Sequence, residues 1–514
     1  MNRRIILLLL VISTVTSLIA QQPRSTGAKL QSIWPGRQPD GSVLLPNLWS
    51  LRPAGAQIDL GDFPVNVAVH PDNRFAAVLH CGFGQNEIAV VDIPALKVVS
   101  RTKIDEAFYG LEFSHVGNRL YCSGAGSEVI HVFNFDDGQL KADREISLRD
   151  VKERGIPGGM AVSSDAKTLY VANVWGQDVA KVDLLARTNV LAIFLGNSKS
   201  AQTSQVSTNA ADFDAAAITK RAEAQFDPTT PDAPFPYACR LDERRRRLYV
   251  SLWAQAAVAV VDLKSNRVVA RWATGEHPNE MLLTKSGRYL YVANANRNTV
   301  TVFDTDKGQA IETLWAALYP SALTGSTPNS LALSPDEKLL FVANACNNDV
   351  AVFDVSLRGK SRSMGFIPVG WYPTSVRVTG DGKYLLVANG KGLTSKANPN
   401  GPTPNKRYTP GSLIEHIGGL MKGTLSVIDL PSREKFAEQL AAYTAAAYRC
   451  SPLQQDSSVG APKPENNPVP FKVGDVGPIK YCIYVIKENR TYDQILGDLP
   501  QGNGEPKLCC FPKR

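Results

Sequence analysis

Seven in-phase copies of one pattern of short, alternating apolar segments predict an all-β fold for this 514-residue chain, a seven-bladed β-propeller of four-stranded blades. Each copy opens with Pro and an alternating stretch. A Leu-aromatic-Val-Ala-Asn segment, a Val-x-Val-x-Asp segment and a last stretch ending in Gly follow, separated by polar turns. Alternation with period two and β-branched residues are typical of strands rather than helices. Packing such four-stranded sheets around an axis buries their apolar faces and leaves only short edges.

Three of the copies are plain and four are degenerate. The second strands of the plain copies are expected at three closely similar segments, Leu290–Asn294, Leu340–Asn344 and Leu385–Asn389. The degenerate copies span Pro64–Asp92, Tyr109–Phe135, Pro157–Asp183 and Pro236–Asp262. Together the copies place the propeller at residues 57–430, after an N-terminal extension at 21–56.

The last copy indicates how the ring closes. It has three strand-like segments but no clear fourth one after Pro431, and residues 431–450 have the pattern of a helix instead. The segment Gln57–Gly61, ahead of the first copy, has the alternation of a strand. We therefore expect this segment to complete the seventh sheet, as in the end-to-end strand exchange that closes many propellers.

The Leu-Tyr-Val-Ala-Asn strands resemble the YVTN-type repeat family of bacterial β-propellers over about residues 57–430. The resemblance implies the propeller fold. It leaves the partner open, because members of that family bind varied partners and a repeat motif fixes packing rather than loops.

One face of the expected ring is elaborated. Loops from second to third strands and loops from one blade to the next open on the same face, and the long insertions at 198–234, 316–327 and 390–422 are of these two kinds. Four recurring asparagines end second strands on this face: Asn173, Asn294, Asn344 and Asn389. Binding concentrates on long loops of rigid scaffolds, so we expect a partner protein or a surface ligand there. The alternative for the asparagines is turn chemistry, since Asn caps turns and tolerates left-handed conformations.

The N-terminus predicts export. Arg3 and Arg4 precede the apolar stretch Ile5–Ile19, and small residues lead to Ala20. This pattern predicts a signal peptide at 1–20 and a periplasmic or extracellular mature protein. No other run is long and apolar enough to span a membrane, so no transmembrane segment is expected after cleavage.

The formal net charge of +8 is mild, and no nucleic-acid partner is expected. The one dense basic run, Arg244–Arg247, is expected to be a solvated hairpin turn because nothing aromatic or basic flanks it. The eight cysteines and six histidines show neither C-x-x-C-H haem spacing nor paired C-x-x-C zinc spacing, so no cofactor is expected in the propeller. A histidine metal site inside the ring is the alternative.

The character of the chain changes after Cys450. A Pro-, Asn- and Ser-rich stretch at 451–477 is expected to be a linker. The continuous apolar run Tyr481–Ile486 then predicts a strand buried on both faces of an α/β sheet. Residues 487–498, with Glu-Asn-Arg followed by Tyr-Asp, resemble the opening of the phosphoesterase family that contains phospholipase C and acid phosphatase enzymes, within the alkaline-phosphatase superfamily.

By that resemblance Glu488 and Asn489 are implied to hold a divalent metal, and hard oxygen ligands suit such a cation. The family's domain runs for hundreds of residues, so residues 478–514 are expected to be an incomplete α/β remnant in which the two residues are idle. We therefore expect an exported, non-catalytic binding or scaffold propeller. The alternative is a phosphoesterase whose catalytic domain is truncated or supplied separately.

Overall fold

The computed structural model describes most of the repeats and parts of the C-terminal region. The described residues are 35–186, 190–196, 233–393, 395, 416–452, 468–469, 476–483, 485–486, 488–502 and 504–512. The predicted signal peptide and nearly all of the insertion at 198–234 lie outside them. The chain forms two compact units, a larger one of residues 35–403 and 408–463 and a smaller one of residues 1–34, 404–407 and 464–514.

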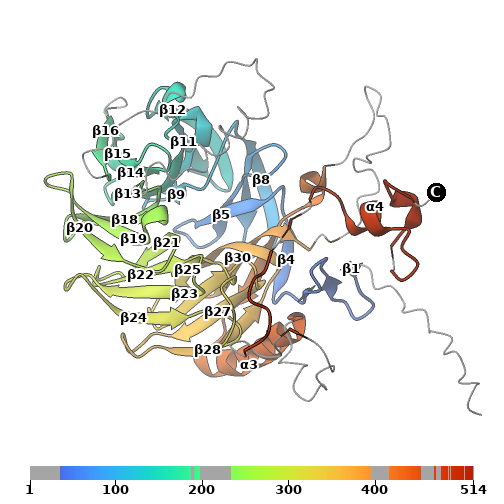
Figure 1. The fold of residues 1–514 in the computed structure, drawn as a ribbon. Coiled ribbons are helices and arrows are strands. Elements are labelled where there is room, and N and C mark those ends of the chain that lie inside the picture. Colours follow the sequence, from blue (N-terminus) through green and yellow to red (C-terminus); the bar gives the residue numbers. More distant parts are fainter. Residues whose placement is uncertain are drawn as a thin grey trace, which may run out of the picture. The chain divides into compact units, whose positions relative to one another are not determined.

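Seven four-stranded antiparallel sheets form most of the larger unit. Figure 1 shows them following one another around a ring, with the first strand of each sheet innermost and the fourth outermost. The predicted all-β, seven-bladed propeller is therefore confirmed. A small three-stranded sheet of the N-terminal extension, β1 (Gly36–Arg37), β2 (Val43–Leu44) and β3 (Ser50–Leu51), was not foreseen from the sequence.

The blades have the following strands, given from the inner to the outer one. Blade 1 holds β5 (Pro64–Val69), β6 (Phe75–His80), β7 (Glu87–Asp92) and β8 (Lys97–Lys103). Blade 2 holds β9 (Leu111–Phe113), β10 (Arg119–Ser123), β11 (Val129–Asp136) and β12 (Gln139–Ser147). Blade 3 holds β13 (Pro157–Val162), β14 (Thr168–Asn173), β15 (Asp178–Asp183) and β16 (Val190–Phe194). Blade 4 holds β17 (Pro236–Asp242), β18 (Arg247–Leu252), β19 (Ala257–Asp262) and β20 (Arg267–Ala273).

The remaining blades continue this order. Blade 5 holds β21 (Pro278–Leu283), β22 (Tyr289–Asn294), β23 (Thr299–Asp304) and β24 (Gln309–Trp315). Blade 6 holds β25 (Pro328–Leu333), β26 (Leu339–Asn344), β27 (Asp349–Asp354) and β28 (Arg362–Pro368). Blade 7 holds β29 (Trp371–Val378), β30 (Tyr384–Gly392), β31 (Thr424–Asp429) and β4 (Ala56–Asp59). Short 3-10 turns lie between these strands: η1 (Ala125–Ser127), η2 (Val151–Glu153), η3 (Trp253–Gln255) and η4 (Ile417–Leu420).

The ring closes through its N-terminal strand. β4 pairs antiparallel with β31, with Ile58 opposite Leu425 and Gln57 opposite Ser426. The Gln57 side-chain oxygen accepts a 2.9 Å hydrogen bond from the Ser426 hydroxyl. The strand exchange expected from Gln57–Gly61 is confirmed.

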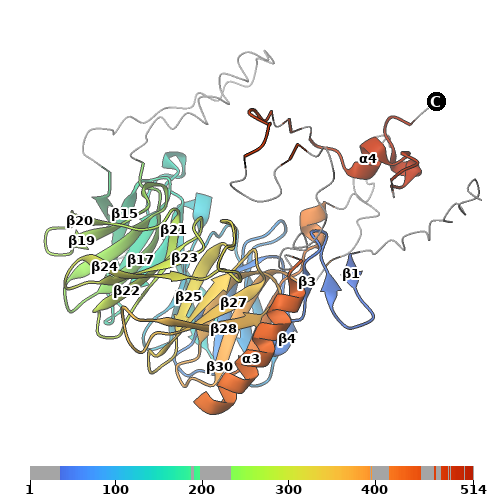
Figure 2. The ribbon, with the colours of Figure 1, turned by 60° about the horizontal axis from the view of Figure 1, so that its bottom comes forward.

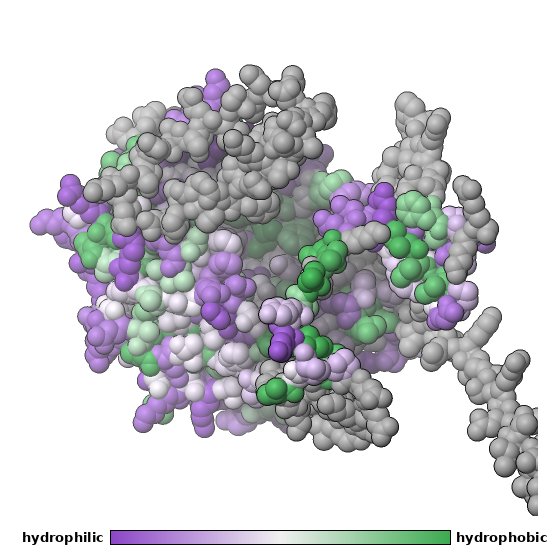
Figure 3. Space-filling model, viewed as in Figure 1, coloured by the Kyte–Doolittle hydropathy of each residue, from purple (hydrophilic) through white to green (hydrophobic). Residues whose placement is uncertain are grey.

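The second strand of each blade is deeply buried because it has a strand on either side and a neighbouring blade on either face. Its recurring aromatic residues, such as Tyr249, Tyr291 and Phe341, are less than 2% exposed. Outer strands such as β8 and β20 are partly exposed and carry Lys and Arg. In Figure 3, hydrophilic side chains gather along the outer edges of the blades that hold β20 and β24. Charges on such edges oppose pairing with other chains.

The basic run at Arg244–Arg247 is the turn between β17 and β18, as predicted. Its charges are paired: Arg245 contacts Asp242 at 3.1 Å and Asp306 at 2.7 Å. Arg247 forms an ion pair with Asp262.

A backbone feature recurs near the start of six of the seven inner strands. Six residues directly before the inner-strand prolines have positive φ, a conformation that non-glycine residues seldom adopt: Phe63, Ile156, Phe235, His277, Thr327 and Tyr372. The pairing of first and second strands shifts register just after each of these prolines. A left-handed residue next to a register shift is typical of a β-bulge.

A second left-handed residue, at the end of the hairpin between the second and third strands, joins one blade to the next. The side-chain oxygen of Gln177 accepts a 2.9 Å hydrogen bond from the N–H of Phe235, and that of Asn348 accepts one of 3.0 Å from Tyr372. Glu128 accepts from Ile156 at 2.7 Å, and Asn298 accepts from Ser326 at 2.8 Å. We call these bonds the interblade latches. Blade 4 has Ala256 at this position, which has no side-chain acceptor.

The helix expected at 431–450 is α3 (Arg433–Cys450), and Figures 1 and 2 both show it beside β28. Phe436 and Leu440 of α3 are buried in one apolar cluster with Phe341 of blade 6. Thr444 Oγ1 accepts a 2.9 Å hydrogen bond from the N–H of Phe366 on β28. The helix thus covers an outer strand whose C-terminal half is apolar.

The smaller unit has little regular structure in its described residues, which hold α4 (Tyr492–Leu496) and the 3-10 turn η5 (Pro506–Leu508). The strand predicted at Tyr481–Ile486 is wrong. The described residues of this run form no strand, and Tyr481, Ile483, Val485 and Ile486 are all exposed. A strand needs neighbours to bond its backbone, and the described part of this unit supplies none.

Candidate functional site

Asn173, Asn294 and Asn344 end second strands, as expected, whereas β30 continues past Asn389 to Gly392; the side chains of all four asparagines are fully buried. Asn173 Nδ2 donates a 2.7 Å hydrogen bond to Asp178, its cross-strand partner at the start of the third strand. The same arrangement joins Asn294 to Thr299, Asn344 to Asp349 and Asn389 to Thr424. The asparagines therefore stabilise the hairpins between second and third strands, which agrees with the alternative of turn chemistry. Direct contact with a ligand stays a prediction.

Asp349 differs from the other partners of these asparagines because it is a buried carboxyl without an ion pair in the described part of the chain. Its Oδ1 accepts a 2.8 Å hydrogen bond from Asn344, while Oδ2 has no hydrogen-bond partner among the described residues. Burial raises the pKa of Asp349 to about 7, because the charged form is poorly solvated there.

Exposed aromatic side chains are confined to one face of the described ring. The exposed Phe and Trp residues between 56 and 429 are Phe83, Trp175, Phe194, Trp253 and Trp315. Three lie between second and third strands, and two are the last residues of outer strands. In an antiparallel four-stranded blade, both places open on the face that carries the long insertions. We call it the long-loop face.

The turns of the opposite face carry aliphatic side chains instead. Leu96, Val116, Leu185 and Leu357 are exposed there. Exposed aliphatic side chains occur on the long-loop face as well, at Val151, Leu323 and Ile417, so the two faces differ in their exposed Phe and Trp alone.

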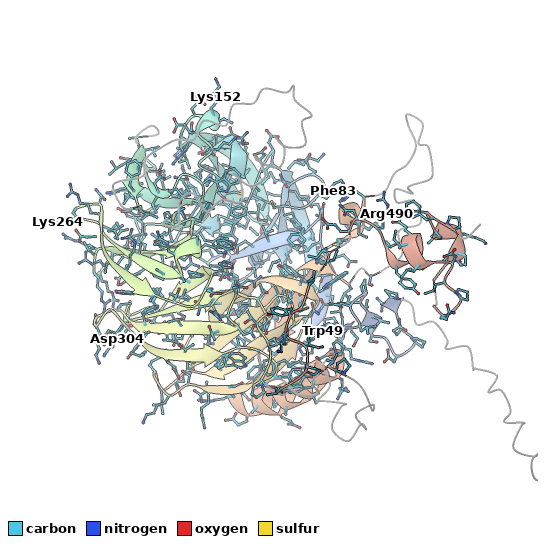
Figure 4. The ribbon with its side chains drawn as sticks, viewed as in Figure 1. Trp49, Phe83, Lys152, Lys264, Asp304 and Arg490 are labelled. Atoms are coloured by element: carbon cyan, nitrogen blue, oxygen red, sulfur yellow. The ribbon has the colours of Figure 1, made fainter. Side chains whose placement is uncertain are left out.

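Two of the exposed aromatic rings on the long-loop face each stack on a histidine ring. The rings of Trp253 and His277 stack at 3.7 Å with 10° between their planes, and Phe83 stacks on His416 at 4.4 Å. Trp253 is 39% exposed and Phe83 63% exposed, so each presents a free ring surface. Figure 4 labels Phe83 on the loop after β6, and Lys264 and Asp304 at the outer side of the ring.

A second group of side chains lies where the inner strands meet. It comprises Tyr109, Glu112, Tyr237, Arg240, Glu280 and Arg377, which we call the axial cluster. Glu112, Arg240 and Arg377 occupy one repeat position, opposite Tyr121, Tyr249 and Leu386 of their second strands. The equivalent residues of the other four blades are Ala68, Ala161, Leu282 and Ala332. Three blades thus place a charge where the repeat favours a small apolar side chain.

Glu280 is the centre of the axial cluster, and its side chain is 1% exposed. It pairs with Arg240 at 3.2 Å and with Arg377 at 2.8 Å. The Ser330 hydroxyl and the Leu331 N–H donate to its second oxygen.

Arg377 extends the network to blade 1. It donates to the Asn66 side-chain oxygen at 2.8 Å and to the Val67 carbonyl at 3.0 Å. Together the contacts of Glu280 and Arg377 tie together blades 4 to 7 and blade 1, across the point where the ring begins and ends.

Two tyrosines lie against these charges from the start of their inner strands. The rings of Tyr109 and Tyr237 are 4.8 Å apart, and the Tyr109 hydroxyl hydrogen-bonds with Arg377. Burial raises the pKa of both phenols above the ordinary value, so both hydroxyls remain neutral. They can therefore act as hydrogen-bond donors at any physiological pH.

Glu112 is the titrating member of the cluster. Burial raises its pKa to about 7, although the charges of Arg240 and Arg377 and the Val162 backbone act to lower it. It forms no ion pair within the described residues. The axial cluster was not predicted from the sequence, although charged residues stand there at a repeat position that is otherwise Ala or Leu.

Glu488 and Asn489 are adjacent and exposed in the smaller unit, ahead of α4. Over the described ranges, no group of three or more His, Cys, Asp or Glu side chains is placed to hold a metal ion. The metal role implied for Glu488 and Asn489 stays a prediction, and the histidine site in the ring gains no support. None of the helices in the described ranges has the length and apolar character needed to cross a membrane.

Comparison with known proteins supports the fold. A family model described as a seven-bladed β-propeller lactonase matches residues 198–311 and, in a second match, 281–394. Uncharacterised proteins YncE from Salmonella typhimurium and Salmonella typhi are 26% identical over 205 residues, covering 35% of this chain and 52% of each relative. The chain thus spans about half the length of the curated relatives it matches.

Solved structures agree at the level of architecture. A chain of Kuenenia stuttgartiensis hydrazine synthase has a TM-score of 0.50 and 18% identity, covering 65% of this chain and 95% of its own. The protein U3-55K has a TM-score of 0.50 and 12% identity, covering 71% and 95%. Likeness at this identity shows the fold alone. The chain is a β-propeller repeat protein of seven blades.

Proposed function

We propose that this chain is an exported binding module that holds a partner protein or a surface ligand on its long-loop face. The observation that carries the proposal is the confinement of exposed Phe and Trp to that face. Aromatic residues are enriched at binding surfaces because they bury a large area at a small cost in conformational entropy. The rigid ring beneath them, closed by β4 and joined by the latches, keeps the loops in a fixed arrangement.

The test uses two matched triple variants of the purified chain. One replaces Phe83, Trp175 and Trp253 by Ala, and the other replaces Leu96, Leu185 and Leu357 on the opposite face. Binding to cell-envelope fractions of the source organism is measured by sedimentation. The aromatic variant should bind at least tenfold more weakly and the control variant like the wild type. Equal binding by both variants, or no binding by the wild type, would contradict the proposal.

Export is part of the proposal and rests on the pattern at residues 1–20. Cell fractionation followed by N-terminal sequencing tests it. The mature protein should be found outside the cytoplasm with its first residue near Gln21.

A second candidate function is hydrolysis of a lactone, favoured by the match of the lactonase propeller model to residues 198–394. A lactone-opening assay with the purified chain tests it by titrating the acid released. The phosphoesterase alternative rests on the resemblance at Glu488 and Asn489. Turnover of p-nitrophenyl phosphate that needs a divalent metal and is lost on Glu488→Ala would support it.

A further inference from the structure

The axial cluster contains more positive charge than its buried carboxylate neutralises. Glu280 is the one carboxylate held by both Arg240 and Arg377. Arg377 is saturated by Glu280, Ser330, Asn66 and backbone carbonyls. The charge of Arg240 is therefore compensated only in part.

Arg240 also has unused donors. Within the described residues its Nη1 donates to the Cys239 carbonyl at 2.8 Å and its Nη2 to Glu280 at 3.2 Å, while a guanidinium has five N–H groups. Its side chain is 31% exposed, against 1% for Glu280. An anion can reach Arg240 without displacing Glu280.

Glu112 decides the net charge of the cluster. The groups that face it are Arg240 and Cys239 of β17, Arg377 of β29 and the Val162 backbone of β13. When Glu112 is protonated, the two arginines and Glu280 leave one positive charge. When Glu112 is ionised, the cluster is neutral.

We propose that the axial cluster binds a small carboxylate monoanion, with Arg240 as its ionic partner, the hydroxyls of Tyr109 and Tyr237 as neutral donors, and Glu112 taking up a proton on binding. The planar guanidinium matches a carboxylate in shape and can bind it through two parallel hydrogen bonds. One net positive charge favours a monoanion over a dianion, which the nearby Glu280 would repel. The site lies within the ring and does not depend on the long-loop aromatics or on any turnover of a lactone.

The pKa of Glu112, about 7, sets the expected pH dependence. Because the anion favours the protonated form of Glu112, affinity should be constant well below pH 7 and fall as the pH rises above it. The fall between pH 6 and pH 8 should be about tenfold, the loss expected when one proton must be taken up.

The experiment is isothermal titration calorimetry of the full chain with sodium lactate at constant ionic strength. Titrations in two buffers of different ionisation enthalpy count the protons taken up. We expect uptake of close to one proton per lactate at pH 8 and about tenfold tighter binding at pH 6. Inorganic phosphate, mostly a dianion at pH 8, should bind more weakly than lactate.

Variants separate the roles. Glu112→Gln should bind lactate equally at pH 6 and pH 8, with no proton uptake. Arg240→Gln should weaken binding at least tenfold at both values, and Arg240→Lys should recover part of it. Arg288→Gln, which removes an arginine paired with Asp304 on the outer side of the ring, is the control and should bind like the wild type.

Circular dichroism and the unfolding temperature establish that each variant is folded. Three results would overturn the proposal. They are no lactate binding by the wild type at pH 6, no proton uptake on binding at pH 8, and unchanged binding in Arg240→Gln.

Discussion

The side-chain oxygen of Asn348 accepts a 3.0 Å hydrogen bond from the backbone N–H of Tyr372, so the last hairpin residue between β26 and β27 of blade 6 is bonded to the second residue of β29 in blade 7. Both residues are left-handed, with φ of 57° and 63°. The bond therefore joins two backbone positions that are each unfavourable for most side chains. Blades are connected here by a side chain as well as by the covalent chain.

Replacing Asn348 by Ala should destabilise the ring by about 1–2 kcal/mol, because the Tyr372 N–H loses its acceptor and Ala tolerates positive φ less well than Asn. Urea unfolding followed by circular dichroism measures the change. Asn347→Ala, one residue earlier, is the control and should have a smaller effect.

The reverse change is available at blade 4, where Ala256 has φ of 47° and no side-chain acceptor. Ala256→Asn places an acceptor at the latch position ahead of His277 and a residue suited to positive φ. We expect a gain of roughly 0.5–1 kcal/mol in the free energy of unfolding. An Asn at this site that lowers stability would show that the Trp253–His277 stack leaves no room for a latch.

Arg377→Met should be strongly destabilising, by about 3–5 kcal/mol, because it leaves Glu280 buried with only one of its two arginines. Arg288→Met removes an arginine that is half exposed and pairs with Asp304, so it should change stability by less than about 1 kcal/mol. Thermal unfolding of both variants beside the wild type tests the contrast. Similar shifts in both would mean that the network around Glu280 adds nothing beyond a surface pair.

Two aspartates of blade 6 should have opposite pH behaviour. The pKa of Asp349 is raised from 3.8 to about 7, so its contribution to stability is fully present below about pH 4 and is lost as the pH rises through 7. Asp349→Asn removes that loss. The free energy of unfolding of this variant, relative to the wild type, should therefore rise by on the order of 3 kcal/mol between pH 4 and pH 8.

Asp354 is the matched control, because hydrogen bonds from Ser356 and the nearby Arg362 and Arg433 lower its pKa to about 2. Its contribution is present above pH 4 and is lost as the pH falls through 2. Asp354→Asn should therefore be destabilising at pH 7, and its difference from the wild type should shrink in acid. Urea midpoints at pH 3, 5 and 8 test both variants, and parallel pH profiles would contradict the assignment.

Gly365→Ala should loosen α3. A Cβ at Gly365 would lie 2.2 Å from Thr444 Oγ1, and the φ of Gly365, 143°, disfavours a side chain. Faster hydrogen exchange of residues 433–450 is expected, with the exchange of β26 unchanged. Gly359→Ala is the control. An added Cβ at this turn meets only one atom, at 4.0 Å, so the hydrogen exchange of α3 should stay unchanged.

The fold was predictable because each blade repeats the same local choices. Leu340–Ala343 is a continuous apolar run, as suits a second strand buried on both faces. The ends of the ring could be matched because Gln57–Gly61 has a strand pattern and the last copy lacks a fourth strand. The site was predictable only in part. The long-loop face followed from loop lengths, whereas the stacking of Trp253 on His277 and of Phe83 on His416 joins residues from different turns.

The axial cluster shows why the rest was missed. Glu112, Arg240, Glu280 and Arg377 lie on four different blades, and their contact depends on how the blades surround the axis rather than on any local spacing. The strand expected at Tyr481–Ile486 was predicted wrongly because only the local sequence was considered. An apolar run gives strand propensity, but a strand forms only where other strands bond its backbone.

The pairing of β4 with β31 sets an order of events during synthesis. Ser426 follows its partner Gln57 by 369 positions, so β4, the first strand of the propeller to be synthesised, cannot be paired until nearly the whole ring has been made. Until then both edges of the future seventh sheet are open to other chains, and only the final segment ends that exposure. A chain interrupted before Thr424 would therefore keep β4 unpaired and the seventh sheet open, and such unpaired strand edges promote association with other chains.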